Sequence, residues 1–148
     1  MLTLRTATAA DEKRINELFE EMLRSVYHTQ AADGYENGYL EQYWNGSENR
    51  IYLAEDDEVR AYLSIQVYRE LIPYLYLDDL SVTERCRGRG IGTSLLLAAE
   101  SYAKEIRIPN IVLHVEKTNE RAFRLYESLG YSIFRDDGSR YLLSRNLA

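Results

Sequence analysis

The chain has 148 residues, of which 45% are hydrophobic and 28% are charged, as is typical of one soluble globular domain, here spanning residues 1–148. No apolar run approaches the ~18 residues that a membrane span needs, and "MLTLRTATAADEKR" at the start lacks a signal-peptide core, so we expect a cytoplasmic protein without a membrane partner. The single cysteine, Cys86, excludes an internal disulfide and a cysteine-based metal site, and we expect no metal.

The net charge of −6 argues against a general nucleic-acid-binding protein. Residues 11–60 carry 13 acidic and 5 basic side chains, whereas residues 83–146 carry 11 basic and 8 acidic ones. This distribution predicts an anionic partner for the C-terminal half and favours a cationic one for the N-terminal half. Solvated faces of uneven charge explain the acidic half equally well.

The first elements are a short strand, "LTLRTA", and a helix. Thr8 and Asp11 have the spacing of a capping box at the start of this helix, and an apolar stripe follows from Ile15 to Val26. The next stretch, residues 27–50, is aromatic and punctuated by glycine, and it predicts little helix.

Residues 51–70 predict a hairpin, because apolar side chains alternate on both sides of an acidic turn at residues 56–58. The alternating positions are Ile51 and Leu53 before the turn, and Ala61, Leu63, Ile65 and Val67 after it. Pro73 then precedes another strand, "YLYLDDLSV".

The C-terminal half alternates helices and strands. Apolar residues at spacings of three and four predict a helix from Ile91 to Ile106, and "NIVLHVE" is an apolar strand. "NERAFRLYESLG" is a helix that Gly130 closes, and a terminal hairpin turns at Asp137-Gly138. The predicted order is β-α-(α)-β-β-β-α-β-α-β-β, a mixed sheet flanked by helices.

The junction "ERCRGRGIGTS", residues 84–94, indicates a binding site between a strand and a helix. The first N–H groups of a helix have no intrahelical partner, and glycines leave them open to a ligand. Arginines add positive charge, so the junction predicts a cradle for a phosphate-bearing ligand; the alternative is a plain turn with solvated arginines. The residues concerned are Gly88, Gly90 and Gly92, and Arg85, Arg87 and Arg89.

Two nucleotide-binding motifs fail at this junction. A Walker loop needs a lysine that is missing after Gly92, and a dinucleotide fingerprint finds Thr93 or Leu95 where its third glycine belongs. A dinucleotide-dependent oxidoreductase is therefore disfavoured. What remains is R-x-x-G-x-G at residues 87–92, which resembles the signature loop of the GNAT superfamily of N-acyltransferases that bind acetyl-coenzyme A.

A second segment, "LHVEKTNERAFRLYESLGY", is similar to the other characteristic segment of that superfamily. The matching residues are Asn119, Ala122, Leu125, Tyr126, Leu129, Gly130 and Tyr131. The resemblance is specific over residues 74–131. The sequence before residue 74 is compatible with the superfamily but carries no specific motif of it. It implies an α/β fold of one GNAT-like domain: a mixed, mostly antiparallel central sheet with one parallel, splayed strand pair, and helices on both faces.

The resemblance also implies how acetyl-coenzyme A would bind. Backbone amides from Arg87 to Thr93 would hold the pyrophosphate, and the strand from Leu80 to Val82 would bond the pantetheine arm through its main chain. The amides include those of Gly88, Arg89, Gly90 and Gly92. In the family this strand and the next one splay apart, and the thioester lies in the gap. Asn119 would contact the cofactor, and it is equally suited to cap the following helix.

The activity implied is direct transfer of the acetyl group to a primary amine in a ternary complex. The amine would belong to a small molecule, a peptide N-terminus or a lysine. Tyr126 stands where the family places its general acid, although Ala122 and Leu129 beside it on the helix would also suit a core aromatic. A coenzyme A-binding sensor or scaffold without catalysis is the alternative.

For the catalytic base, Asp78 is the first choice, acting through water, and Asp79 is the second. These two side chains point to opposite faces of their strand, so at most one faces the acceptor directly. Glu116 is a third choice, and salt-bridge or bulge roles for the aspartates are an alternative. His28 lies in the variable stretch, and His114 is expected to be a packed core residue.

The acceptor pocket is predicted from an aromatic and acidic stretch, which suits an organic cation. Its members are Tyr27, Tyr35, Tyr39, Tyr43 and Trp44, with Asp33, Glu36 and Glu41 nearby. The alternative is that these aromatics pack a helix onto the sheet or form a dimer face. Together with the terminal hairpin, they favour a homodimer.

Overall fold

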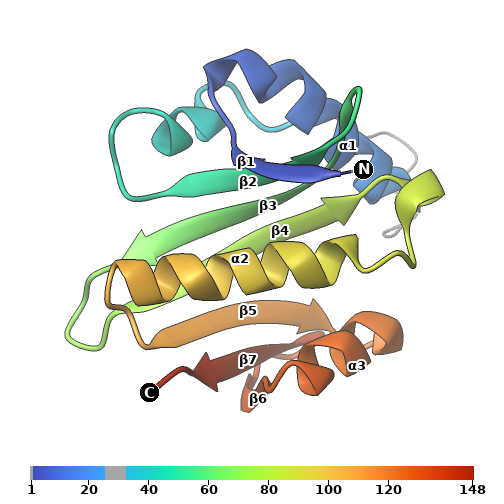
Figure 1. The fold of residues 1–148 in the computed structure, drawn as a ribbon. Coiled ribbons are helices and arrows are strands. Elements are labelled where there is room, and N and C mark those ends of the chain that lie inside the picture. The colour runs from blue at the N-terminus through green and yellow to red at the C-terminus, as the bar shows by residue number, and fades with distance from the viewer. Residues whose placement is uncertain (1, 26–32) are drawn as a thin grey trace. The chain divides into compact units, whose positions relative to one another are not determined.

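The computed structural model describes residues 2–25 and 33–148, so Val26, Tyr27 and His28 lie outside the described residues. Within these ranges the strands form one sheet of seven, in the order β1-β2-β3-β4-β5-β7-β6. The strands are β1 (Thr3–Thr6), β2 (Arg50–Glu55), β3 (Val59–Tyr68), β4 (Tyr74–Val82), β5 (Asn110–Glu116), β6 (Ser132–Asp136) and β7 (Arg140–Asn146). The α-helices are α1 (Glu12–Ser25), α2 (Ile91–Glu105) and α3 (Glu120–Ser128), and the 3₁₀ helices are η1 (Ala9–Asp11), η2 (Tyr39–Tyr43) and η3 (Glu84–Cys86) (Figure 1).

The element order and the mixed sheet confirm the predicted fold. Most recorded pairings are antiparallel, and β4 and β5 form the parallel pair. The parallel ladder ends at Leu77 opposite Leu113, although both strands continue beyond these residues. Residues Met1–Ile65 with Asp79–Ala98 form one compact unit, and Gln66–Asp78 with Ala99–Ala148 form a second.

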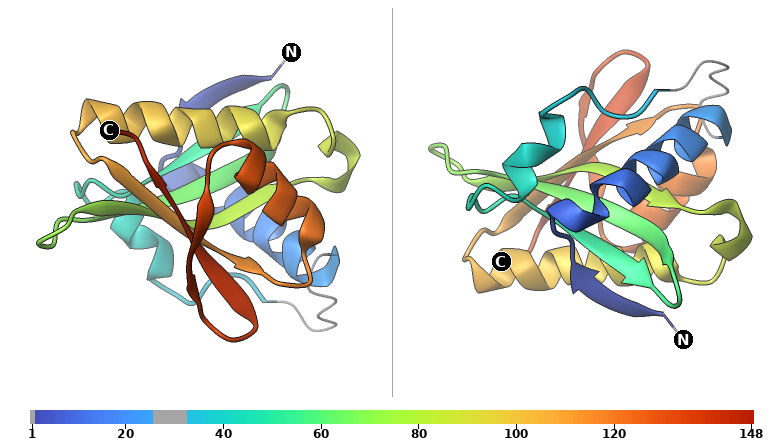
Figure 2. Two further views of the ribbon diagram at one scale, coloured as in Figure 1. Left: turned by 90° about the horizontal axis from the view of Figure 1, so that it is seen from below. Right: turned by 90° about the horizontal axis from the view of Figure 1, so that it is seen from above.

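In the first unit, α1 and the first half of α2 lie on opposite faces of β2 and β3 (Figure 2). The predicted capping box is present: the Asp11 carboxylate accepts from the Thr8 N–H at 2.9 Å, at the start of η1. The side chain of Arg5 binds the same carboxylate at 2.7 Å and ties β1 to this helix start. Both contacts fix where α1 begins.

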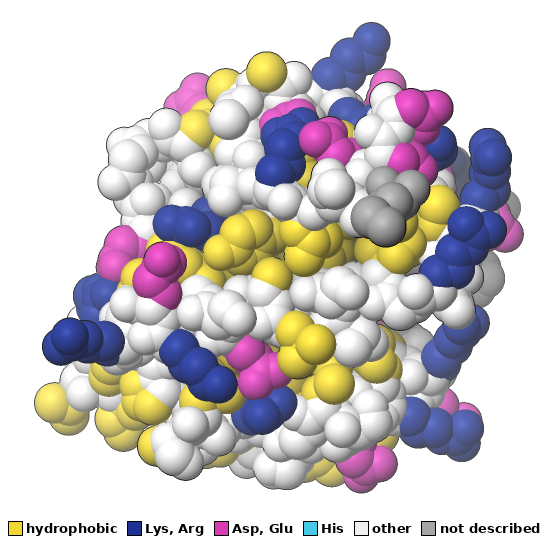
Figure 3. Space-filling model, viewed as in Figure 1, with side chains coloured by type: hydrophobic (Ala, Val, Ile, Leu, Met, Phe, Trp, Pro, Cys, Tyr) yellow, Lys and Arg dark blue, Asp and Glu magenta, His cyan; other side chains and the backbone are white. Residues whose placement is uncertain are grey.

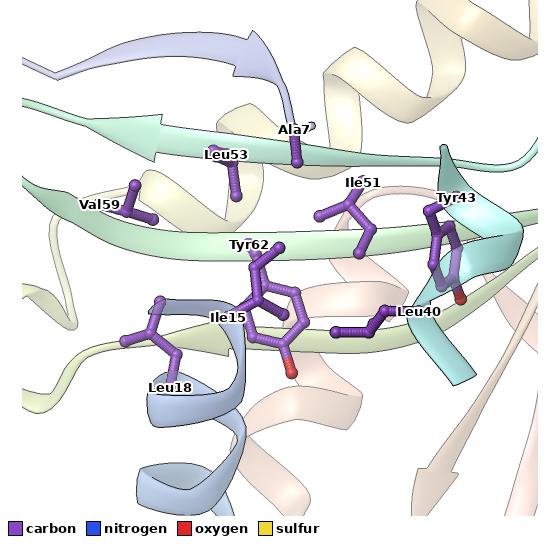
Figure 4. Close-up of a cluster of buried hydrophobic side chains, with 9 residues drawn as sticks. All are labelled: Ala7, Ile15, Leu18, Leu40, Tyr43, Ile51, Leu53, Val59 and Tyr62. Atoms are coloured by element: carbon purple, nitrogen blue, oxygen red, sulfur yellow. The ribbon is translucent and has the colours of Figure 1, made fainter. Parts of the chain in front are cut away.

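A buried cluster fills the space between α1, η2 and the strands of the first unit (Figure 4). Its members are Ala7, Ile15, Leu18, Leu40, Tyr43, Ile51, Leu53, Val59 and Tyr62. The predicted hairpin is present as the antiparallel pair β2 and β3. Leu53 lies opposite Tyr62, and Tyr52 opposite Leu63, so the two apolar sets of the hairpin face opposite sides of the sheet. Both sides of β3 are therefore buried at its centre.

In the second unit, the expected elements at the C-terminus are present. The apolar side chains of β5 alternate as predicted, with Ile111, Leu113 and Val115 buried. Gly130 after α3 has a φ of 97°, which is the left-handed conformation that closes a helix. The Asp137 N–H donates to the Arg140 carbonyl at 2.9 Å and closes the β6–β7 hairpin.

Candidate active site

The glycine-rich junction lies between η3 and α2 in the first unit. Gly88 and Gly90 both have a φ of 79°, a conformation that glycine adopts without the steric cost that other residues incur. A Cβ built at Gly90 would meet no atom within 4 Å, so the backbone there faces open space. The Ser94 N–H donates to the Gly90 carbonyl at 3.0 Å, which begins the helical ladder. The N–H groups of residues 91–93 precede that ladder and suit an anion.

The guanidinium of Arg87 is held by other groups of the protein and is therefore not available to bind an anion at the turn. Its Nε donates to the Val82 carbonyl at 2.8 Å, and its Nη2 donates to the Ser25 hydroxyl at 3.1 Å. The same nitrogen lies 3.6 Å from the carboxylate of Glu21 on α1. The guanidinium of Arg87 therefore binds the turn to α1. The arginines of the turn that are exposed to solvent are Arg85 and Arg89. Lys and Arg side chains project from the surface around this turn (Figure 3).

Glu21 was not predicted from the sequence, and it holds the start of the same turn. Its carboxylate accepts from the Thr83 hydroxyl at 2.9 Å and from the Glu84 N–H at 3.0 Å. One side chain of α1 thus fixes the backbone that leads into the glycines. Cys86 is buried in this turn.

Asp79 of β4 is tied to the aromatic stretch. The hydroxyl of Tyr35 donates to the Asp79 carboxylate at 2.5 Å, so the Tyr62 hydroxyl, 2.7 Å away, donates to Tyr35 in turn. The Asp79 N–H donates to the hydroxyl of Ser64 at 2.9 Å. Burial raises the pKa of Tyr35, and the neighbouring Tyr62 and Asp79 raise it further, so Tyr35 stays a neutral donor.

The aromatic stretch packs onto the core of the first unit. Tyr35 stacks on Phe19 with ring centroids 3.9 Å apart and on Tyr39 at 4.9 Å, and Tyr43 is buried. This arrangement favours the packing alternative for these rings. An open cavity of about 350 Å³ is lined by Tyr35 with Glu36, Glu41 and neighbouring polar side chains.

The remaining predicted positions on β4 are half-buried along the strand. They are Asp78, Leu80 and Val82. In the second unit, Glu116 ends β5 and is also half-buried.

Asn119 and Tyr126 lie at the start and near the end of α3. The Asn119 side chain accepts from the Ala122 N–H at 3.3 Å, which confirms its predicted capping role. The ring of Tyr126 meets that of Tyr131 edge to face, with centroids 6.0 Å apart. Tyr126 is half-buried, whereas Tyr131 is only 3% exposed and supplies the core aromatic.

His114 differs from its prediction as a packed core residue. Its Nδ1 lies 2.8 Å from the hydroxyl of Tyr76, and its Nε2 lies 2.8 Å from the carboxylate of Asp137. The histidine therefore sits in a polar chain that joins β4, β5 and the β6–β7 turn. Its partners are 38 and 23 residues away in the sequence, so no local pattern indicates them.

Comparisons with known proteins agree with this fold. The model of the acetyltransferase (GNAT) family matches residues 13–131, and the chain belongs to that family. An uncharacterized N-acetyltransferase of Methanocaldococcus jannaschii is 31% identical over 134 residues, covering 88% of this chain and 78% of that protein.

Two further matches illustrate a partial similarity and a similarity of the fold alone. A mycothiol acetyltransferase of Acidothermus cellulolyticus is 39% identical over 66 residues, and this match spans 45% of the chain but only 19% of that protein. The crystal structure of PaiA N-acetyltransferase from Thermoplasma acidophilum in complex with coenzyme A has a TM-score of 0.83 at 18% identity, over 99% of both chains. Among residues 2–25 and 33–148, no helix is long and apolar enough to cross a membrane.

Proposed function

We propose that the chain transfers an acetyl group from acetyl-coenzyme A to a primary amine. The observation that carries this proposal is the turn at residues 88–93, where two left-handed glycines lead into helix N–H groups that precede the helical ladder. Such a turn suits a phosphate group through its aligned donors and the positive end of the helix dipole. Membership in the acetyltransferase family supports coenzyme A as the source of that phosphate.

The other contacts proposed for the co-substrate use this chain's own backbone and side chains. Leu80 and Val82 would bond the pantetheine arm through their main chain, as in the addition of a strand. Asn119 would add a contact while it caps α3. These assignments rest on the resemblance of residues 74–131 to the family.

The reaction joins the amine nitrogen to the thioester carbonyl carbon, and the carbon–sulfur bond breaks. An amine attacks only as its free base, so an ammonium group must first lose a proton. Tyr126 would give its phenolic proton to the leaving sulfur and recover one from the newly acylated nitrogen. Asp79 is weakened as a candidate base, because its carboxylate already accepts from Tyr35.

The direct test measures free thiol released from acetyl-coenzyme A across a panel of amines. The panel would contain n-butylamine, a polyamine, a peptide with a free N-terminus and a peptide with an internal lysine. We expect turnover with at least one member, with acetylation at the amine verified by mass spectrometry. Separate calorimetric titrations with acetyl-coenzyme A and with NAD accompany the thiol-release assay. We expect the protein to bind acetyl-coenzyme A and not NAD.

The two measurements separate the alternatives. Binding of acetyl-coenzyme A without thiol release on any amine would favour a sensor or scaffold. Absence of binding at low salt would contradict the proposal as a whole.

A further inference from the structure

One face of α1 is joined to the segment that leads from β4 into the glycine-rich turn, all within the first unit (Figure 1). The Ser81 hydroxyl donates to the Leu18 carbonyl at 3.2 Å, and the Thr83 hydroxyl donates to the Glu21 carboxylate at 2.9 Å. Leu18 and Glu21 are three residues apart and therefore lie on the same face of the helix. The last turns of α1 thus follow the end of β4.

The carboxylate of Glu21 holds this segment with both of its oxygens. Oε1 accepts from the Thr83 hydroxyl, and Oε2 accepts from the Glu84 N–H at 3.0 Å. At the other end of η3, Arg87 donates to the Val82 carbonyl at 2.8 Å, and its Nη2 lies 3.6 Å from Oε2 of Glu21. We call the side chains of Glu21, Thr83 and Arg87 the clasp. It fixes both ends of η3 immediately before the glycines.

The clasp is placed to affect binding more than stability. The side chains of Glu21 and Arg87 are 31% and 30% exposed, and ion pairs with such access to water stabilise a fold little. Beyond the clasp, Gly88, Arg89 and Gly90 are exposed, and glycine loses more conformational freedom than any other residue when it is ordered. If the turn were not ordered in advance, the free-energy cost of ordering it would reduce the affinity for a ligand.

The clasp also adds no net charge to the turn. The carboxylate of Glu21 alone would repel an anion bound nearby, and the guanidinium of Arg87 compensates it. The exposed arginines Arg85 and Arg89 then supply the positive charge that an anion requires. A carboxylate can therefore fix the backbone of an anion site without opposing the anion.

We propose that Glu21, Thr83 and Arg87 are positioning residues of the co-substrate site. Their side chains hold the turn at residues 88–93 in its anion-binding conformation before acetyl-coenzyme A binds. This inference rests on the proposed function. In this scheme the three side chains do not touch the co-substrate: Glu21 and Thr83 fix the backbone, and Arg87 compensates the charge of Glu21.

The first test removes one hydroxyl without changing any charge. Thr83→Val should weaken acetyl-coenzyme A binding by about fivefold, as expected if the turn adopted its binding conformation about one-fifth of the time. Thr83→Ser keeps the donor to Glu21 and should bind within about twofold of the parent protein. Calorimetric titration measures both affinities. Equal affinities of the two variants would overturn the proposal.

The second test separates position from charge at Glu21. Glu21→Gln keeps one accepting oxygen and loses the other, so the turn should loosen. Removal of the negative charge favours an anion, but in 0.5 M salt the Debye length is only about 4 Å and this effect is screened. Relative to the parent protein at the same salt, affinity should fall by about fivefold in 0.5 M salt and by less in 0.05 M salt. An affinity equal to or above that of the parent in 0.5 M salt would contradict a positioning role.

Asp11→Asn is the matched control. Asp11 makes the same kinds of contact at the other end of α1, where its carboxylate accepts from the Thr8 N–H at 2.9 Å and from Arg5 at 2.7 Å. The variant should lower the melting temperature and leave acetyl-coenzyme A affinity within about twofold of the parent. An equal loss of affinity in Asp11→Asn and Glu21→Gln would assign Glu21 a general role in stability and overturn the proposal.

Amide hydrogen exchange of the ligand-free protein gives a readout that needs no activity. The Glu84 N–H, which donates to Glu21, should exchange at least about fivefold faster in Thr83→Val and Glu21→Gln than in the parent or Asp11→Asn. Unchanged exchange would show that the clasp does not order the turn.

Kinetics distinguish this inference from the proposed function. At saturating acetyl-coenzyme A, kcat of the Thr83 and Glu21 variants should stay within about twofold of the parent, because the clasp does not touch the reacting atoms. A parent protein that binds acetyl-coenzyme A, with variants that bind it equally well, would reject the clasp alone. A parent protein that does not bind acetyl-coenzyme A would reject the proposed function, and this inference with it.

Discussion

The hydroxyl of Tyr35 donates a hydrogen bond of 2.5 Å to the carboxylate of Asp79. The same tyrosine is fixed at its backbone, where its N–H donates to the Asn16 side chain on α1 at 2.7 Å. A Cβ at Gly34 would lie 2.5 Å from that side chain, which explains a glycine just before Tyr35. The aromatic stretch is thus attached to both α1 and β4 of the first unit.

Tyr35→Phe should destabilise the fold by roughly 1–2 kcal/mol, because Asp79 and Tyr62 both lose a buried hydrogen-bond partner. The pKa of Tyr35 is raised by burial, so its contribution is complete below the unfolded-state pKa near 10 and declines at higher pH. Urea unfolding at pH 7 and pH 10.5 should show a smaller alkaline loss in the variant. Tyr141→Phe serves as the control, since it keeps the ring beside Phe123. An unchanged midpoint at pH 7 would contradict the expected role of Tyr35.

Gly90→Ala should weaken acetyl-coenzyme A binding by about tenfold or more, or about 1.4 kcal/mol. The added methyl group would occupy the open space beside the helix N–H groups. Gly46→Ala is a matched control, because Gly46 also has a positive φ, 90°, and open space around its Cβ. Both variants should lose about 1–2 kcal/mol of stability from the backbone conformation. Calorimetric titration distinguishes them: equal affinities would argue against phosphate binding at this turn.

Tyr126→Phe should lower turnover by a factor within roughly 10²–10⁴, the range for a positioned proton donor, with little change in acetyl-coenzyme A affinity. The ring and its contact with Tyr131 are kept, so the fold should be unaffected. Steady-state thiol release and calorimetry measure the two effects separately. Full turnover in this variant would remove Tyr126 from the mechanism.

Local patterns in the sequence predicted most of the fold. The strands at residues 74–82 and 110–116 have the predicted bounds, because an apolar pattern and flanking turn residues define them without any distant partner. The glycine-rich junction between strand and helix was also predicted, as a way to leave the helix N–H groups open, and the left-handed φ of Gly88 and Gly90 is an additional finding of the structure. The cytoplasmic location and the homodimer stay predictions.

The side-chain pairs of the site were not predictable in the same way. Tyr35 and Asp79 are 44 residues apart, and His114 and Asp137 are 23 apart, so only the folded register of the strands brings them together. The charge of Arg87 was assigned to the ligand because its partner Glu21 lies on a distant helix. Burial on both faces of β3 was missed for a related reason: alternation shows which residues share a face, but not how many faces are covered.

Tyr131→Phe should have the opposite effect on stability from Tyr35→Phe, although the chemical change is the same. The Tyr131 hydroxyl is buried and has no hydrogen-bond partner among the described residues. Removing it therefore removes a desolvated polar group without breaking a bond, and stability at pH 7 should stay the same or rise by about 1 kcal/mol. Burial, and then Glu100, raise the pKa of Tyr131, so the parent protein loses stability above pH ~10, where the unfolded chain ionises. The variant should lack that part of the alkaline loss in urea unfolding at pH 7 and pH 10.5. A destabilisation of more than about 1 kcal/mol at pH 7 would show that the hydroxyl has a partner in solution.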